Sequence, residues 1–198
     1  MIRAYFNQRA DIWDETVAEK DTAKLERMAT RLNLKPGFTI LDVGTGTGVF
    51  LPFITDKVGQ GGQVVAIDIA DEMLLKARTK GFPGNIDYLC ADVMDIPIAD
   101  QVFDAVICYS SFPHFQDKPK AFAEIRRVIR DGGSLMICHT SSRAAINQIH
   151  HQIPEVQGDL IPDRKEMRSM LSATGFVDIA IEDNSDSYLA RASKPRMA

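Results

Sequence analysis

Cysteine, long apolar runs and excess positive charge are all scarce in this chain. Its three cysteines, Cys90, Cys108 and Cys138, show no C-x-x-C spacing, which indicates reduced thiols rather than a disulfide framework or a cysteine metal site. No apolar run approaches the roughly 20 residues that a membrane span needs. The first five residues lack the hydrophobic region of a signal peptide. We therefore expect a cytoplasmic protein with no membrane partner.

The charge balance argues against a nucleic-acid partner. The net charge is −4, and the basic tail over residues 191–196 is short, so it is expected to be a solvated chain end. Hydrophobic residues make up 45% of the 198 residues, which is enough to bury one full core. No repeat or low-complexity segment interrupts the sequence. The composition therefore predicts a single compact domain, monomeric or homodimeric.

What the sequence does contain is a glycine-rich turn after an apolar segment. Residues 38–41 are mainly apolar, Asp42 follows, and Gly44, Gly46 and Gly48 stand at alternate positions before an amphipathic stretch. Glycine tolerates positive φ and lets a ligand approach the main chain without meeting a Cβ. The pattern predicts a buried strand, a turn at its carboxyl end and a helix, and open α/β sheets bind ligands at such turns. An ordinary strand-to-helix turn would show the same spacing.

The turn is poorly suited to pyrophosphate. A dinucleotide motif requires G-x-G-x-x-G, but the position of the third glycine is Val49, and no Gly-Lys-Ser/Thr tripeptide for a P-loop occurs in the chain. The carboxylate of Asp42 would repel phosphate and attract a cation or an amine. These features weaken the hypothesis of a nicotinamide-dependent oxidoreductase.

Four further strands are expected, of which one ends in an acidic residue and another is followed closely by one. They are residues 63–68, 86–90, 103–109 and 134–138, with a helix over 118–129 and a turn over 130–133 before the last strand. Asp68 lies about 20 residues beyond the glycines, where an acid can accept hydrogen bonds from both ribose hydroxyls of an adenosine. Asp92 could accept one from the adenine amino group. Asp71 is expected to cap the helix that it begins.

In their order and spacing these segments resemble the class I S-adenosylmethionine-dependent methyltransferases, in the branch (type 11/25) that includes quinone-biosynthesis enzymes. The matching segments are residues 5–14, 41–48, 66–68, 73–74, 91–93, 103–106 and 124–133. The resemblance extends from about Tyr5 to Thr140. Asp131 departs from it, because proline is common there in the family, and the region after Ser141 matches only in general layout.

The resemblance implies a fold and a division of the chain. The expected fold is α/β: a Rossmann-like, doubly wound, seven-stranded, mostly parallel sheet whose C-terminal strands, residues 176–181 and 187–192, form an antiparallel edge hairpin. The single domain is divided into a helical cover (1–33), a cofactor-binding core (34–140), acceptor-side helices with closing strands (141–193) and a tail (194–198). The periodicity of apolar residues predicts a helix over 22–32. Asp163 and Glu166 predict a capping box for a helix that runs to Ala173.

The implied cofactor is S-adenosylmethionine, with S-adenosylhomocysteine as the product. The residues expected to bind it are Tyr5, Trp13, Asp42, Gly44, Thr45, Gly46, Gly48, Asp68, Ile69, Met73, Asp92, Val93 and Tyr109. Tyr5, Phe6 and Trp13 could cover the cofactor, since an aromatic face near a sulfonium is favourable. The same three side chains could equally form a hydrophobic seam that holds the first helix.

Three histidines are expected at the catalytic end of the sheet. His114 could act as a general base or orient an acceptor hydroxyl, or it could be a loop histidine bonded to the backbone. His139 is the second catalytic candidate. His139 and His150 could instead bind a metal, but the sequence offers no carboxylate pair or cysteine cluster beside them, so no metal is predicted. Asp159 and Asp163 are expected to be turn or helix caps.

The methyl acceptor is expected to be a small molecule. No Asn-Pro-Pro-Tyr stretch follows the strand at 103–109, which argues against the amino-group methylation of bases or glutamine. Only about 35 residues lie between His139 and the end of the last predicted helix, which leaves little room for a large lid. The apolar residues Ile146, Ile149, Ile153, Val156 and Leu160 could form the acceptor pocket or serve ordinary helix packing. A non-catalytic module or sensor that binds S-adenosylmethionine or S-adenosylhomocysteine is the alternative function.

Overall fold

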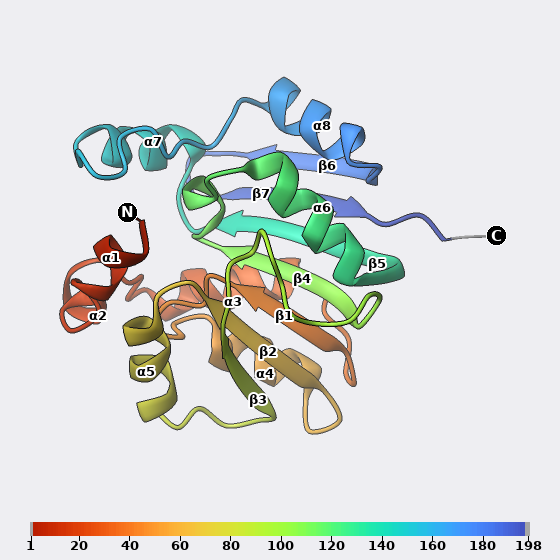
Figure 1. The fold of residues 1–198 in the computed structure, drawn as a ribbon, viewed down its shortest axis with the longest axis horizontal. Helices are drawn as coiled ribbons and strands as arrows, with labels where there is room; N and C mark the ends of the chain where they lie inside the picture. Colours follow the sequence, from red (N-terminus) through yellow and green to blue (C-terminus); the bar gives the residue numbers. More distant parts are fainter. Residues whose placement is uncertain (1, 197–198) are drawn as a thin grey trace.

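The computed structural model describes residues 2–196, which form one seven-stranded sheet with helices on both faces (Figure 1). The strands are β1 (Thr39–Val43), β2 (Gln63–Asp68), β3 (Ile86–Cys90), β4 (Phe103–Tyr109), β5 (Ile129–His139), β6 (Val177–Asp183) and β7 (Tyr188–Ser193). Their order is β3-β2-β1-β4-β5-β7-β6. Strands β1 to β5 are parallel, and β7 is antiparallel to both β5 and β6. The predicted Rossmann-like sheet with an antiparallel C-terminal hairpin is confirmed.

Two apolar layers hold helices against the two faces of the sheet. The helices are α1 (Ile2–Asn7), α2 (Trp13–Thr16), α3 (Thr22–Arg31), α4 (Leu51–Val58), α5 (Asp71–Thr79), the 3₁₀ turn η1 (Phe112–His114), α6 (Lys118–Val128), α7 (Arg143–His151) and α8 (Arg164–Ala173). Helices α3 and α4 pack on one face, and α6 and α8 on the other. Because both faces are covered, β1 and β4 are almost continuously buried. Within residues 2–196, none of these helices combines the length and apolarity that a bilayer crossing demands.

The start of β5 differs from the expected turn. Residues 130–133 belong to the strand, which begins at Ile129. Phe103 pairs with Ile129 whereas Ala105 pairs with Ser134, so the extra residues form a bulged segment in which Gly132 has a φ of +79°. A bulge accommodates the same glycines that a turn would use, which explains why the sequence favoured a turn.

The two predicted helix caps have different outcomes. The Asp163 carboxylate accepts a hydrogen bond from the Glu166 amide at 2.8 Å, which confirms the cap of α8. The prediction for Asp71 was wrong, because Ala70 occupies the N-cap of α5. The Asp71 carboxylate instead accepts hydrogen bonds from Arg3 and Asn7, and these bonds lower its pKa. Asp71 therefore ties α1 to α5.

Candidate functional site

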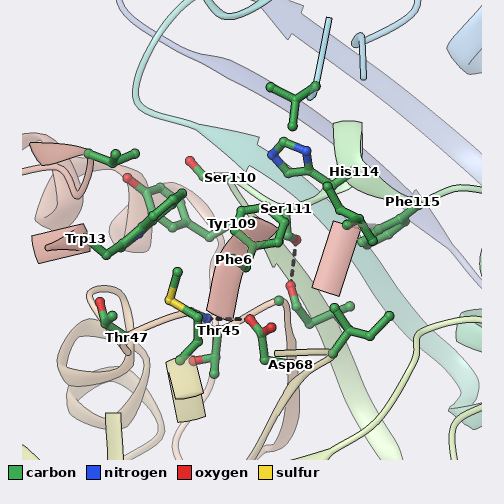
Figure 2. A pocket seen from close by; sticks show the side chains of 18 of the residues that line it. Phe6, Trp13, Thr45, Thr47, Asp68, Tyr109, Ser110, Ser111, His114 and Phe115 are labelled. Atoms are coloured by element: carbon green, nitrogen blue, oxygen red, sulfur yellow. Dashed lines mark hydrogen bonds between the residues drawn. The ribbon is translucent and has the colours of Figure 1, made fainter. Parts of the chain in front are cut away.

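A cavity of about 620 Å³ opens at the carboxyl ends of the parallel strands. Its wall comes from α1 and α2, the turn after β1, the ends of β2 to β5, η1 and α7. Figure 1 shows α1, α2 and α7 together beyond this end of the sheet. Figure 2 shows Thr45 and Asp68 in one part of the cavity, His114 in another, Phe6 between them, and Tyr109 to one side near Trp13. We call the first part the cofactor half and the second the acceptor half.

The glycine turn shapes the cofactor half. Its backbone amides at Gly44 and Thr45 donate to the Ile67 carbonyl at 2.8 and 3.0 Å, and the Gly46 amide donates to Oδ2 of Asp68 at 2.8 Å. Gly46 has a φ of +56°, and a Cβ at this position would have nothing within 4 Å. The main chain at Gly46 thus presents an open surface to the cavity.

The two flanking glycines serve packing instead. A Cβ on Gly44 would lie 2.4 Å from the Cβ of Ser111, whose hydroxyl donates to the Val43 carbonyl at 2.6 Å. A Cβ on Gly48 would lie 2.5 Å from the ring of Phe82. Gly44 lines the cavity and Gly48 does not. Close approach of the turn to Ser111, just after β4, and to the Phe82 ring therefore favours glycine at both positions.

Asp68 is a buried acceptor at the end of β2. Its second oxygen, Oδ1, accepts from the Ala70 amide at 2.8 Å. Burial raises the pKa of Asp68, while the bonds from Ala70 and Gly46 oppose that rise. A carboxylate has about four lone-pair sites, so each oxygen can accept one more hydrogen bond from a ligand.

Asp42 lies behind the turn rather than in the cavity. Its side chain is 2% exposed and is absent from the cavity lining within residues 2–196. Burial, reinforced by the charge of Asp68, raises the pKa of Asp42 to about 7. The position fits a role in supporting the turn, and the assignment of Asp42 to the amino-acid end of the cofactor stays a prediction.

The other predicted cofactor residues do line the cavity. They are Tyr5, Trp13, Gly44, Thr45, Gly46, Asp68, Ile69, Met73, Asp92, Val93 and Tyr109. Asp92 also accepts from the Met94 amide at 2.9 Å, which fixes its carboxylate in a local turn. Their assignment to particular parts of the cofactor stays a prediction.

The N-terminal aromatic residues both cover the cavity and pack beside it. Tyr5, Phe6 and Trp13 line it, and the Phe6 ring meets Trp13 and His114 edge-on, with centroid distances of 5.5 and 5.0 Å. Phe6 and Trp13 also pack against Ala10, Ala70 and Met73. The cover and the hydrophobic seam are therefore the same contact surface.

Tyr109 is held by packing and by a hydrogen-bonded chain that the sequence did not indicate. Its ring stacks on Phe50 with a centroid distance of 4.5 Å. Its hydroxyl is 3.0 Å from that of Thr140, which in turn donates to Glu19 at 3.2 Å. Burial raises the pKa of Tyr109 to about 12. Thr140 and Glu19 line the cavity but come from segments with no motif, so only the folded chain reveals them.

All three candidate histidines line the acceptor half. Nδ1 of His114 lies 2.8 Å from Oδ2 of Asp159, and Nδ1 of His150 is hydrogen bonded to the backbone carbonyl of the same residue. The prediction that Asp159 serves as a turn cap was wrong, because its carboxylate pairs with an imidazole. The rings of His114 and His150 lie 4.9 Å apart. Burial lowers the pKa of His150. His139 is only 4% exposed, and burial lowers its pKa to about 3.

The acceptor half also contains apolar side chains. Ile146, Ile149, Ile153 and Val156 line it, whereas Leu160 does not. Among residues 2–196, no group of three or more histidine, cysteine or acidic side chains is arranged to hold a metal ion. The geometry therefore gives the pair His139 and His150 no further protein ligand.

The sheet order and the cavity at the carboxyl ends of the parallel strands define a Rossmann-like domain with one candidate site. A family model described as a methyltransferase domain matches residues 41–137. A ubiquinone/menaquinone biosynthesis C-methyltransferase of Idiomarina loihiensis is 26% identical over 222 aligned positions, which cover 93% of this chain and 88% of that protein. The chain belongs to the class I S-adenosylmethionine-dependent methyltransferases.

Solved structures share the fold. A methyltransferase of Haloferax volcanii, in complex with the Trm112 methyltransferase activator, gives a TM-score of 0.78 at 20% identity over 96% of this chain and 98% of that one. A methyltransferase of Aquifex aeolicus that depends on S-adenosylmethionine gives a TM-score of 0.74 at 24% identity. The match covers 90% of this chain and 95% of that one. At these identities the likeness is one of fold.

Proposed function

We propose that this chain transfers the methyl group of S-adenosylmethionine to a small-molecule acceptor bound between η1 and α7. The observation that carries the proposal is the continuity of one cavity from Gly46 and Asp68 to His114 and the apolar side chains of α7. Its volume of about 620 Å³ is within the range for drug-sized ligands, roughly 300–1,000 Å³. A large polymer is disfavoured because α1 and α2 form part of the cavity wall and narrow the space for an acceptor.

The cofactor half offers what an adenosyl ligand needs. Asp68 can accept from two hydroxyls, and Gly46 leaves space beside the main chain. Thr45 is buried and lines the cavity, so its hydroxyl is placed within reach of a ligand. When bound, S-adenosylmethionine supplies a methyl group already activated on a sulfonium. The protein then mainly has to align the acceptor with it.

The acceptor half offers a base and hydrogen-bonding groups. His114, paired with the Asp159 carboxylate, is suited to take the proton that a neutral acceptor loses as it is methylated. His139 has a strongly lowered pKa and stays neutral near pH 7, so it suits hydrogen bonding rather than proton uptake. These roles distinguish the two histidines, although both line the same space.

The alternative is a module that binds S-adenosylmethionine or S-adenosylhomocysteine without catalysis. Calorimetric titration with both compounds and with NAD is the first test. Binding of both adenosyl compounds and none of NAD is expected, and failure of both to bind would contradict the proposal. The protein is then incubated with methyl-labelled cofactor and fractionated small-molecule extracts. Transfer of label into a fraction supports the enzyme, whereas tight binding with no transfer into any fraction supports the sensor.

A further inference from the structure

We propose that Asp159 is a positioning residue that directs two imidazoles into the acceptor half, and that this half selects a neutral acceptor carrying a hydroxyl that donates a hydrogen bond. The inference rests on the proposed function, because it concerns the acceptor side of the same cavity. It adds the chemical class of the acceptor and a residue that does not itself line the cavity.

The first step is the tautomer of each ring. The partner of Nδ1 in His150 is the Asp159 carbonyl, which can only accept, so this nitrogen must carry the hydrogen. The partner of Nδ1 in His114 is the Asp159 carboxylate, which accepts when ionised. Each neutral ring then has an unprotonated Nε2. Because both residues line the cavity, these two atoms are hydrogen-bond acceptors available to a ligand.

The second step is what holds Asp159 between the rings. The side chain of Asn147 on α7 bonds both the amide and the carbonyl of Ile161, at 2.9 and 3.0 Å. Val156, in the same loop, is 2% exposed, and its carbonyl accepts from the Asp159 amide at 2.9 Å. The loop is thus tied to α7 after Asp159, and a turn within the loop fixes the backbone before it. One residue orients His114 through its side chain and His150 through its backbone.

The third step is the charge of the lining. No lysine or arginine occurs among the cavity-lining residues of the described chain, and its only charged side chains besides histidine are Glu19, Asp68 and Asp92. A phosphate or carboxylate on the acceptor would lose its hydration without gaining a cation. A neutral hydroxyl can instead donate to an imidazole Nε2 while its apolar body packs on the α7 isoleucines. The lining therefore favours a neutral, mainly apolar acceptor with a hydroxyl.

The tautomers are tested by nitrogen NMR of the full chain labelled in its histidines, recorded at alkaline pH. In the unmodified protein we expect the Nδ1–H tautomer for both His114 and His150. In Asp159→Ala we expect His114 to lose it and His150 to keep it, since the backbone carbonyl remains. Asp163→Ala, which removes another acid of the same loop, should change neither ring. An Nε2–H tautomer of His114 in the unmodified protein, or no change in Asp159→Ala, would overturn the positioning role.

Acceptor selection is tested with three probes of one shape, 1-naphthol, 1-naphthoate and 1-naphthyl phosphate, titrated into protein saturated with S-adenosylhomocysteine. We expect 1-naphthol to bind at least about tenfold more tightly than either anion, because the anions find no compensating cation. Asp159→Ala should weaken 1-naphthol binding, and Asp163→Ala should not. Equal binding of the three probes, or no binding of 1-naphthol, would overturn the inference.

Saturation with S-adenosylhomocysteine is measured first, so a failure there would contradict the proposed function instead. The comparison of the three probes needs no variant, and therefore stands even where Asp159→Ala does not fold.

Discussion

The two halves of the cavity are built by different means. The cofactor half uses the ends of β1 to β4 and the turn after β1, which lie within residues 39–109 and are placed by neighbouring strands of one sheet. The acceptor half joins α1, η1, α7 and the loop 152–163, which are far apart in the sequence and lie together beyond the sheet (Figure 1). The first half is positioned by backbone register, and the second by contacts between side chains of distant segments.

The hydrogen bonds of the key polar residues show the same difference. Asp68 is held by two backbone amides, those of Gly46 and Ala70. His114 is held by one side chain, the Asp159 carboxylate, 45 residues away. A change in the cofactor half should therefore alter binding of the cofactor with little effect on the acceptor, and the converse should hold for the acceptor half.

The largest expected effect on cofactor affinity comes from Gly46→Val. The new side chain would project into the space beside the turn, where no protein atom lies within 4 Å, so it should block the cofactor rather than disrupt the core. We expect affinity for S-adenosylhomocysteine to fall by about 100-fold or more in calorimetric titration. Gly37→Val is the matched control, since Gly37 also has a positive φ and open space but does not line the cavity. Equal loss of binding in the control would show that backbone strain, and not obstruction, is responsible.

His114→Ala tests the other half. If the imidazole takes the acceptor's proton, turnover with an identified acceptor should fall by about 10²–10⁴. Affinity for S-adenosylhomocysteine should stay nearly unchanged, which is the separation between halves that the architecture predicts. His151→Ala is the control, because His151 is exposed on the same helix as His150 and does not line the cavity. Normal turnover in His114→Ala would leave alignment alone as the mechanism at this position.

The contrast between the halves also explains how much could be predicted from the sequence. The strands, the turn with Gly46 and the acid Asp68 follow from apolar runs and glycine spacing, which are local patterns. The pairing of His114 with Asp159 has no local pattern, because it depends on the path of the loop after α7. Asp42 shows a different limit, since its place at the end of β1 suggested a ligand contact. The alternation of side chains along β1 instead turns it into the core behind the turn.

Asp42→Asn tests whether the ionised carboxylate of Asp42, buried behind the turn, lowers the free energy of unfolding. Its pKa of about 7 is higher than the usual value of about 4 for an unfolded chain. Between these values the folded state binds more protons, so stability should fall as pH rises and then level off above about pH 7. Asparagine does not ionise, so the variant should be more stable than the parent by about 2–4 kcal/mol at pH 8, with the difference vanishing near pH 4.

Urea unfolding at pH 4.5, 6 and 8 measures this difference. Asp186→Asn, at an exposed acid between β6 and β7, is the control and should show no such pH dependence. An Asp42→Asn protein that is no more stable than the parent at pH 8 would mean that the carboxylate is stabilised in its ionised form by the turn.

Asp68→Ala removes the predicted acceptor of the ribose hydroxyls. We expect a loss of about 1.5–3 kcal/mol in the binding of S-adenosylhomocysteine, because a charged hydrogen-bond acceptor is lost. Asp87→Ala, on the exposed edge strand β3, should leave the affinity unchanged. Unchanged affinity in a folded Asp68→Ala protein would show that the ribose is held elsewhere, and would remove the main polar contact assigned to the cofactor half.

The smallest expected effect concerns residues 5–13, which contact both halves because Phe6 packs against both His114 and Met73. Much of their attachment is by exposed ion pairs, such as Arg9 with Glu155 at 3.2 Å and Lys76 with Asp11 at 2.7 Å, and each such pair contributes only about 0–1 kcal/mol. The apolar contacts of Phe6 and Trp13 face the cavity, so a bound cofactor would extend them. We expect amide hydrogen exchange in this segment to slow by about tenfold when S-adenosylhomocysteine is bound, while exchange in β4 stays unchanged. Equal protection with and without the ligand would mean that the segment is a fixed packing element, and that the acceptor must enter by another side of the cavity.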